Sequence, residues 1–459
     1  MKKRLSMLEG PLVPGIMKFV VPVILTNLLQ ILFNTADLIV VGQYCGSLSV
    51  GAVSATNSLT MLIVNFFIGF SVGTGLSVAR SIGAKQSDVI HRTIHTAIPT
   101  AAICGGLVSI IGVLFSSTFL RWMDTPENVL PLSSLYLRIY FSGMIFNMLY
   151  NFSASILRAT GETKLPLYYL SAAGVLNVVL NLFFVTVLKM NVAGVALATT
   201  ISQALSAILT LNALIHRTDD CRLIVRKLRI YSKEFLTIIR LGLPAGIQSS
   251  LFALSNVIIV SSINSFNSAA IISGNGAAHS LEGMLSSVTG GFTTTSINFI
   301  GQNAGARNYK RVKKAYGICL SCMAATVLTI SVIMFLFRKQ LLGLYITDNP
   351  EAILYGVIRM SYINCFYVLL GIMDISTAAL RGLGYSFVPM LITLMGACGL
   401  RIAWVYTIFQ IPQYHTMACL YQSYPVSWII TFSVEFILFM VICKKKQSSE
   451  NPLSQRSYT

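Results

Sequence analysis

The sequence contains an internal duplication that covers most of its length. At one constant offset, landmarks of the first half recur in the second half, and a single added residue keeps the later landmarks aligned. The aligned pairs are Pro22 with Pro244, Asn34 with Asn256, Gly69 with Gly291, Gly83 with Gly305, Arg158 with Arg381, Gly161 with Gly384, and Pro166 with Pro389. A repeat at a fixed spacing reports a repeated structural unit, so the chain is expected to fold as two matched halves.

The repeated unit is strongly apolar, which indicates a membrane protein. Hydrophobic residues make up 55% of the 459 residues and charged residues only 10%, whereas a soluble domain carries about 25% charged residues. Since a helix needs about 20 apolar residues to cross a bilayer, the chain has room for about twelve spans and for no large soluble domain.

Apolar runs between polar connections predict an all-α membrane protein with twelve transmembrane helices in two six-helix lobes related by the duplication. The expected spans are 15–40, 48–79, 93–119, 133–157, 166–188, 191–215, 242–263, 271–300, 315–337, 355–380, 386–409 and 417–443. A parallel duplication of hydrophobic helices is typical of secondary transporters. A duplicated membrane domain without a transport role is the alternative.

The basic residues predict how the spans are oriented. With the N-terminus inside, most of the 33 Lys and Arg residues fall in the inner connections, and the outer loops hold Arg121, Lys189, Arg338 and Lys339. Because cytoplasmic loops are enriched in Lys and Arg, both termini are predicted to be cytoplasmic. The net charge of +18 is thus a topology signal and a contact with anionic lipid, and no groove for nucleic acid is expected.

The chain is predicted to divide into four parts. They are an N-terminal lobe at 1–215, a cytoplasmic linker at 216–240, a C-terminal lobe at 241–446 and a cytoplasmic tail at 447–459. Within the linker, residues 222–233 are basic and predict an amphipathic helix on the inner membrane surface. The basic N-terminus is not followed by the apolar run of a cleavable signal peptide, so the first span is expected to stay as an anchor.

The sequence contains no recognisable catalytic constellation. Its five His residues form no H-E-x-x-H metal motif, and it has no Walker A phosphate loop. Cys319-x-x-Cys322 has the spacing of a redox or zinc half-site, but it lies in an apolar span without a second pair and is interpreted as packing. The chain is therefore predicted not to be an enzyme, and to need no cofactor apart from a proton or sodium ion for coupling.

The first span carries a polar face. Gln30, Asn34 and Asp37 are four and three residues apart, so all three candidates share one side of a helix. An Asp at the centre of a membrane helix costs about 2.5–3.5 kcal/mol, so it is seldom accidental. Pro22 lacks an N–H and is expected to weaken or bend the helix below this face. An ion-gated switch requires such a bendable helix with a titratable carboxylate.

Several motifs occur in a fixed order along these spans. They are Asn34-Thr35-Ala36-Asp37, Gly83-Ala84, Leu157-Arg158-Ala159-Thr160-Gly161, Asn177-Val178-Val179-Leu180-Asn181, Val192-Ala193-Gly194-Val195 with Thr199, and Leu380-Arg381-Gly382-Leu383-Gly384. As an ordered set on a duplicated chain, they resemble the multidrug and toxic compound extrusion (MATE) family of bacterial cation-coupled exporters. The resemblance implies two V-arranged lobes and export of organic, often cationic, compounds against a sodium or proton gradient.

The resemblance also implies a cation site in the first lobe. Asp37, Asn177, Asn181 and Thr199 match the site quartet of the proton-coupled branch of that family. Position 181 is usually Asp in that branch, and Asn can coordinate a cation but cannot take up a proton. Sodium at Asp37 is the one metal ion expected. The alternative is an Asp37 that is only hydrogen-bonded to polar neighbours, without a coupling role.

The second lobe lacks this quartet, because apolar residues stand at the duplicated positions. Its charged candidates are Glu282, Asp374 and Arg401. Opposite charges in one lobe can neutralise one another, so Arg401 is predicted to pair with Asp374 or Glu282. A structural ion pair and a second coupling or substrate site both stay open. For Glu435 in the last span two locations stay open, the inner membrane interface and the central cleft.

The sequence thus predicts a secondary active antiporter that exports organic compounds in exchange for protons or sodium ions. Arg401 as the clear intramembrane cation, against Asp37, Glu282 and Asp374, gives an acidic balance that favours cationic cargo. A lipid-linked precursor flippase of the same superfamily is the alternative, for which several basic residues would be expected in the cavity. The protein is expected to act as a monomer in the bacterial cytoplasmic membrane. Neither its substrate nor its coupling ion is predicted.

Overall fold

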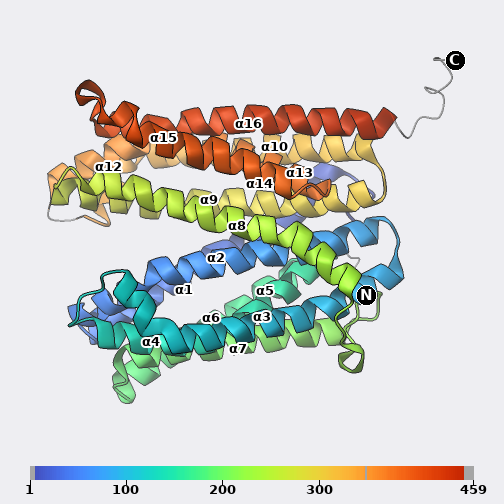
Figure 1. The fold of residues 1–459 in the computed structure, drawn as a ribbon, viewed down its shortest axis with the longest axis horizontal. Helices are drawn as coiled ribbons and strands as arrows, with labels where there is room; N and C mark the ends of the chain where they lie inside the picture. Colours follow the sequence, from blue (N-terminus) through green and yellow to red (C-terminus); the bar gives the residue numbers. More distant parts are fainter. Residues whose placement is uncertain (1–5, 347–348, 449–459) are drawn as a thin grey trace. The chain divides into compact units, whose positions relative to one another are not determined.

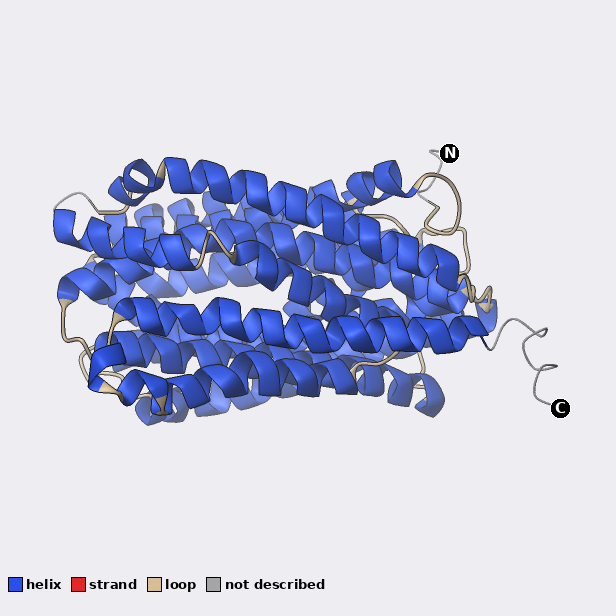
Figure 2. Cartoon of the chain, turned by 90° about the horizontal axis from the view of Figure 1, so that it is seen from above, coloured by secondary structure: helices blue, strands red, loops and turns tan. Residues whose placement is uncertain are grey.

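The computed structural model describes residues 6–346 and 349–448. Over these residues the chain is helical with short connections and has no β-strand (Figure 2). This confirms the all-α prediction. The basic residues 2–4 and the predicted tail from residue 449 onward lie outside the described residues.

The helices of the first half and of the connection are α1 (Leu12–Tyr44), α2 (Ser47–Gly83), α3 (Ser87–Trp122), α4 (Leu130–Ser142), α5 (Met144–Ala159), α6 (Lys164–Leu182), η1 (Phe183–Val187), α7 (Asn191–Ile215) and η2 (Val225–Lys227). Those of the second half are α8 (Ser232–Asn264), α9 (Ala269–Gly305), α10 (Tyr309–Leu336), α11 (Arg338–Gly343), α12 (Pro350–Tyr362), α13 (Tyr367–Gly382), α14 (Phe387–Thr393), η3 (Leu394–Gly399), α15 (Leu400–Tyr406), η4 (Ile408–Gln410), η5 (Pro412–Tyr414) and α16 (Met417–Ser448).

The described residues contain twelve helical spans in the predicted order. Nine are long and apolar enough to cross a membrane by length and composition, and α12 with α13 adds a tenth that is bent by 47°. The other two are α9 and the pair α4–α5. The sequence predicts each span as one helix, but the fourth breaks at Gly143, which lies against the side chain of Thr200 where a Cβ would overlap it.

The connection between α7 and α8 differs from its prediction. The sequence predicts a helix over 222–233, but the segment before α8 holds a single 3-10 turn, η2. The N–H of Ile224 donates to Nε2 of His95 over 3.0 Å, and the N–H of Tyr231 donates to Oγ1 of Thr96 over 3.1 Å. Because these N–H groups bond to side chains of α3, they are not available to a helix.

The chain divides into two compact units. The first holds Leu25–Gly246, and the second holds Ser6–Ile24 together with the chain from Ile247 onward. Both boundaries fall two residues after a duplicated proline, Pro22 in α1 and Pro244 in α8. Proline removes one helical hydrogen bond. The helix that begins each half therefore lacks a backbone hydrogen bond close to the residue at which the chain leaves one unit and enters the other. The predicted limits of the lobes and linker stay a proposal.

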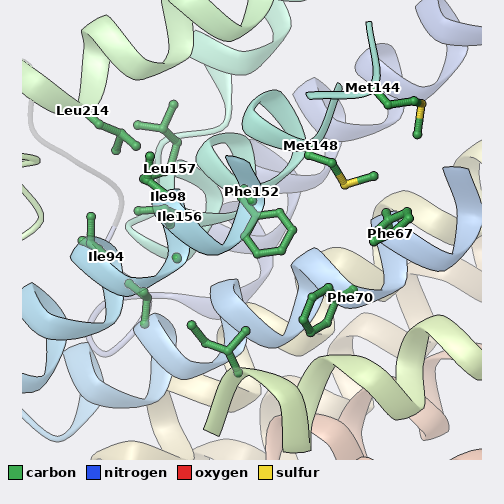
Figure 3. Close-up of a cluster of buried hydrophobic side chains, with 14 of the residues drawn as sticks. Phe67, Phe70, Ile94, Ile98, Met144, Met148, Phe152, Ile156, Leu157 and Leu214 are labelled. Carbon is green, nitrogen blue, oxygen red and sulfur yellow. The ribbon is translucent and has the colours of Figure 1, made fainter. Parts of the chain in front are cut away.

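An apolar core holds the first unit together (Figure 3). Phe67 and Phe70 of α2 pack with Phe152 of α5, and the rings of Phe70 and Phe152 meet edge to face with centroids 5.6 Å apart. Edge-to-face aromatic pairs add about 0.5–1.5 kcal/mol to the burial of their area. Leu214 brings α7 into the same core.

Small residues allow α2 and the first part of α8 to approach closely within the first unit. Gly69 faces the backbone of Ala245, and Gly73 faces the backbone of Gly242. A Cβ at either glycine of α2 would overlap this backbone, and one at Gly246 would overlap the backbone of α2. Both helices thus carry the small-x-x-x-small spacing that permits close helix contact in membranes.

In the second unit, α13 occupies a central position. It packs against α9, α10 and α16, and α16 also contacts α10, α14 and η3. Figure 1 shows α16 running beside α10 and α13. Arg381 of α13 and Glu435 of α16 are therefore enclosed by neighbouring helices.

Candidate functional site

The four polar side chains of the predicted quartet meet in the first unit. Asp37 of α1 is 8% exposed. Nδ2 of Asn181 on α6 donates to Oδ1 of Asp37 over 2.5 Å, and Oγ1 of Thr199 on α7 lies 3.2 Å from Oδ2 of Asp37. The hydroxyl of Thr199 also lies 3.0 Å from the carbonyl oxygen of Val195. The two carboxylate oxygens are therefore contacted by side chains from two different helices. We call Asp37, Asn177, Asn181 and Thr199 the first-unit cluster.

The two asparagines connect this cluster into one network. Nδ2 of Asn181 lies 3.2 Å from Oδ1 of Asn177, and Nδ2 of Asn177 lies 3.3 Å from Oγ1 of Thr199. Among the described residues, Oδ1 of Asn181 is buried without a hydrogen-bond partner. The cluster thus offers a carboxylate, amide oxygens and one unused amide lone pair, which are ligands suited to a proton or a hard cation.

Two features near the cluster were not predicted. Asn181 stands just before the π-helical turn η1, and such turns are rare and frequent at functional sites. Tyr136 and Tyr140 of α4 lie within electrostatic range of Asp37. Two tyrosines one helical turn apart in the fourth span were the available signal.

The remaining first-span candidates lie apart from the cluster. Gln30 is half-buried and Asn34 is exposed. In the part of the chain that the structure describes, neither forms a hydrogen bond with the first-unit cluster. Pro22 is buried and lies inside a continuous α1. A role for these three residues stays a prediction.

The first-unit cluster has a single carboxylate. Within residues 6–346 and 349–448, no group of three or more His, Cys, Asp or Glu side chains could hold a metal ion. One proton or one monovalent cation would balance the charge of Asp37, with neutral oxygens completing its surroundings.

The predicted pairing of Glu282 with Arg401 is wrong. Glu282 of α9 pairs with Arg359 of α12, through Nε to Oε1 at 2.8 Å and Nη2 to Oε2 at 2.7 Å. Nη1 of Arg359 donates to Oδ1 of Asn275 over 2.6 Å. Arg359 is 3% exposed and Glu282 is 5% exposed. A charged residue inside the expected span 355–380 was the signal that could have identified this partner.

Arg401 has no carboxylate partner among the described residues. Its Nε donates to Oγ of Ser427 over 2.9 Å, and its guanidinium carbon lies 4.2 Å from the ring centroid of Tyr424. The rings of Phe252 and Trp428 lie 5.4 and 5.5 Å away. Aromatic faces attract cations, so these three rings contact the guanidinium of Arg401 where an ion pair with Asp374 was expected.

Three other charged side chains of the second unit lie on α13 and α16. Asp374 is half-buried. Arg381, the duplicated partner of Arg158, is 8% exposed, and its Nη2 donates to Oε1 of Gln248 over 2.6 Å. Glu435 is completely buried. Since Arg359 and Arg381 are buried as well as Arg401, the prediction that Arg401 is the clear intramembrane cation is wrong.

The chain matches known proteins over most of its length. The MatE family model matches residues 22–183 and 244–407. The probable multidrug resistance protein YoeA of Bacillus subtilis is 28% identical over 94% of both chains. The FAD transporter of Shewanella oneidensis is 24% identical over 83% of this chain and 84% of its own. The solved outward-facing structure of a multidrug resistance MATE family transporter superposes with a TM-score of 0.90 at 20% identity, over 98% of this chain and 99% of that one.

Proposed function

Since this chain belongs to the MatE family of efflux transporters, we propose that it is an antiporter that exports organic compounds in exchange for protons or sodium ions. Membership makes it a multi-pass membrane transporter of small molecules and not an enzyme. The coupling ion, the antiport mechanism and the cargo are the parts that we propose.

The buried Asp37 carries this proposal. It lies on α1, and its carboxylate is bound by side chains of α6 and α7. A bound ion would neutralise the carboxylate and weaken its hydrogen bonds to these side chains. Without a bound ion, the charged carboxylate would attract the donors of α6 and α7 more strongly. Binding and release of one ion therefore change how three helices hold one another. Such a differential interaction is what shifts a conformational equilibrium.

One coupled ion supplies enough free energy for export. An ion that crosses 100 mV releases about 2.3 kcal/mol, which supports roughly a 40-fold gradient of a neutral solute. ATP is not needed for a gradient of this size.

Purified protein in proteoliposomes tests the proposal. A proton gradient and a sodium gradient are imposed in separate experiments. One of the two should drive a fluorescent organic cation against its own gradient. The gradient that drives movement identifies the coupling ion. If neither gradient drives transport of any tested cargo by folded, correctly inserted protein, ion-coupled export is excluded.

An anionic cargo is the second candidate, as for a flippase of lipid-linked precursors. The observation in its favour is the set of three buried arginines in the second unit, Arg359, Arg381 and Arg401. The name of the FAD transporter of Shewanella oneidensis points to an anionic compound for that relative. The same liposomes, loaded in parallel with an organic cation and with a dinucleotide, distinguish the two classes of cargo.

We further propose that the protein lies in the bacterial cytoplasmic membrane with the 216–240 connection inside. The basic residues of this connection support that orientation. A thiol introduced by Ile230→Cys, at a position 40% exposed, should react with an impermeant reagent only after the cells are opened. A thiol introduced by Lys189→Cys, in a predicted outer loop, should react in intact cells. The reverse pattern would invert the topology.

A further inference from the structure

Glu435 of α16 is a completely buried carboxyl group whose two oxygens have different surroundings. Its exposed fraction is 0%. Oε1 accepts from Oγ1 of Thr377 on α13 over 2.7 Å and lies 3.1 Å from Oγ1 of Thr393 on α14. Oε2 is buried and has no hydrogen-bond partner among the described residues. A buried carboxylate that is ionised normally needs hydrogen-bond donors on both oxygens, whereas Glu435 has hydroxyl neighbours on Oε1 only.

The hydroxyl protons around Glu435 are too few for a buried carboxylate. Oγ1 of Thr393 lies 2.9 Å from the carbonyl oxygen of Pro389 as well as near Glu435. A hydroxyl has one proton, so Thr393 can donate to only one of these acceptors. If Glu435 itself carries a proton on Oε1, it can donate to Oγ1 of Thr393 while Thr393 donates to Pro389. The contacts are then consistent with a neutral carboxylic acid.

The charges around Glu435 also allow the ionised form. On α13, Asp374 and Arg381 lie within electrostatic range of Glu435. Tyr316 of α10 also lies in range, and its hydroxyl is 2.8 Å from Oγ of Ser376. The segments α14 and η3 contribute no charged residue. Nε of Arg381 is buried without a hydrogen-bond partner among the described residues, so this guanidinium can serve as a counter-ion when Glu435 loses its proton.

The backbone beside Glu435 is irregular. Thr393 is followed directly by the π-helical segment η3, as Asn181 in the first unit is followed by η1. Gly396 of η3 lies so close to Thr431 of α16, one helical turn before Glu435, that a Cβ would overlap its side chain. Each acidic site thus borders a π-helical segment, and such segments are frequent at functional sites.

We propose that Glu435 is a second proton-exchange site, separate from Asp37 and located in the second unit. A proton from water binds to Oε1, an O–H bond forms, and the charge of the side chain changes from −1 to 0. Release returns one proton to water and leaves a carboxylate beside Arg381. The distances from Oε1 to the hydroxyl oxygens of Thr377 and Thr393, 2.7 and 3.1 Å, favour a proton over a metal cation, because they are those of oxygens joined directly by a hydrogen bond.

Infrared difference spectroscopy of the full-length protein in lipid, recorded as the pH is varied, tests this site. The carbonyl stretch of a protonated carboxylic acid should titrate in the unmodified protein. In Glu435→Gln the component of this band that belongs to Glu435 should disappear, whereas the matched variant Asp37→Asn should retain that component. Replacing potassium with sodium in the buffer should leave its midpoint unchanged.

Thr377→Val keeps the titratable group and tests the site independently if Glu435→Gln does not fold. It removes one donor to the carboxylate, so the midpoint of the Glu435 band should move to higher pH by about one unit. A titrating band of unchanged amplitude in Glu435→Gln, a Glu435 component that does not titrate, a midpoint of that component that moves with sodium, or an unchanged midpoint in Thr377→Val would each overturn the proposal.

Discussion

An Asp37→Asn protein should fold, insert into the membrane and bind cargo, but it should lose gradient-driven export. Asn keeps the shape of Asp: its oxygen can accept from Nδ2 of Asn181, and its NH2 group can donate to the hydroxyl oxygen of Thr199, the two groups that contact the oxygens of Asp37. It cannot carry the charge that a coupling ion neutralises. The roughly 40-fold gradient available from one ion at 100 mV should therefore fall to about onefold. Proteoliposome efflux under an imposed ion gradient measures this change.

Two further variants make the Asp37 result specific. Asp88→Asn makes the same chemical change at an exposed position of α3 and should leave export unchanged. Asn181→Asp adds a second carboxyl group in contact with Asp37 and should shift the pH or sodium dependence of export, because two adjacent carboxylates cannot both ionise easily. Normal gradient-dependent export by well-expressed Asp37→Asn protein would falsify this assignment.

The first-unit cluster could be predicted because its signals are local. Asn177 and Asn181 are one helical turn apart, and a carboxylate in an apolar span is conspicuous. What joined them to Thr199 was the resemblance to a known family, since nothing in helical spacing says which spans meet. The hydrogen bonds at 2.5–3.3 Å show that the four side chains do meet.

The partners in the second unit could not be derived in the same way. Arg359 and Glu282 are 77 residues apart in sequence, and their contact depends on how α9 packs against α12. The prediction took Arg401 as the clear intramembrane cation and therefore paired it with Asp374 or Glu282. Aromatic rings at Tyr424 and Trp428 surround Arg401 instead. Rings are common in apolar spans, so their arrangement around a cation has no signature of its own.

The fold was predicted more completely than its irregularities. Length and hydropathy give twelve spans because the bilayer sets the length of a helix. The break at Gly143 and the π-helical segment η3 lie where a glycine contacts a neighbouring helix, at Thr200 and at Thr431. Neither these nor the break between α12 and α13 follows from length or hydropathy. The duplication also gives no warning that each compact unit takes in the start of the other half's first span.

Arg359→Leu should destabilise the second unit strongly. Glu282 is 5% exposed and receives two short hydrogen bonds from the guanidinium of Arg359, while Nδ1 of His279 lies farther away, at 3.4 Å from Oε2. Removing the guanidinium leaves a buried carboxylate without its counter-ion, and breaking such a pair costs about 3–5 kcal/mol. The thermal unfolding midpoint of purified protein should fall clearly below that of the unmodified protein. Arg121→Leu, the same substitution at an exposed position, should have little effect.

The double variant Glu282→Leu with Arg359→Leu shows whether the loss comes from the unpaired charge. Replacing a buried ion pair by apolar residues of similar size is often neutral, since no charge then remains to be desolvated. The double variant should therefore be more stable than Arg359→Leu alone, although Asn275 and Tyr421, which hydrogen-bond to each other over 3.2 Å, lose their contact with Arg359. If the double variant is instead as unstable as the single one, the side chain of Arg359 stabilises α12 through packing and through Asn275, and the pairing of charges contributes little.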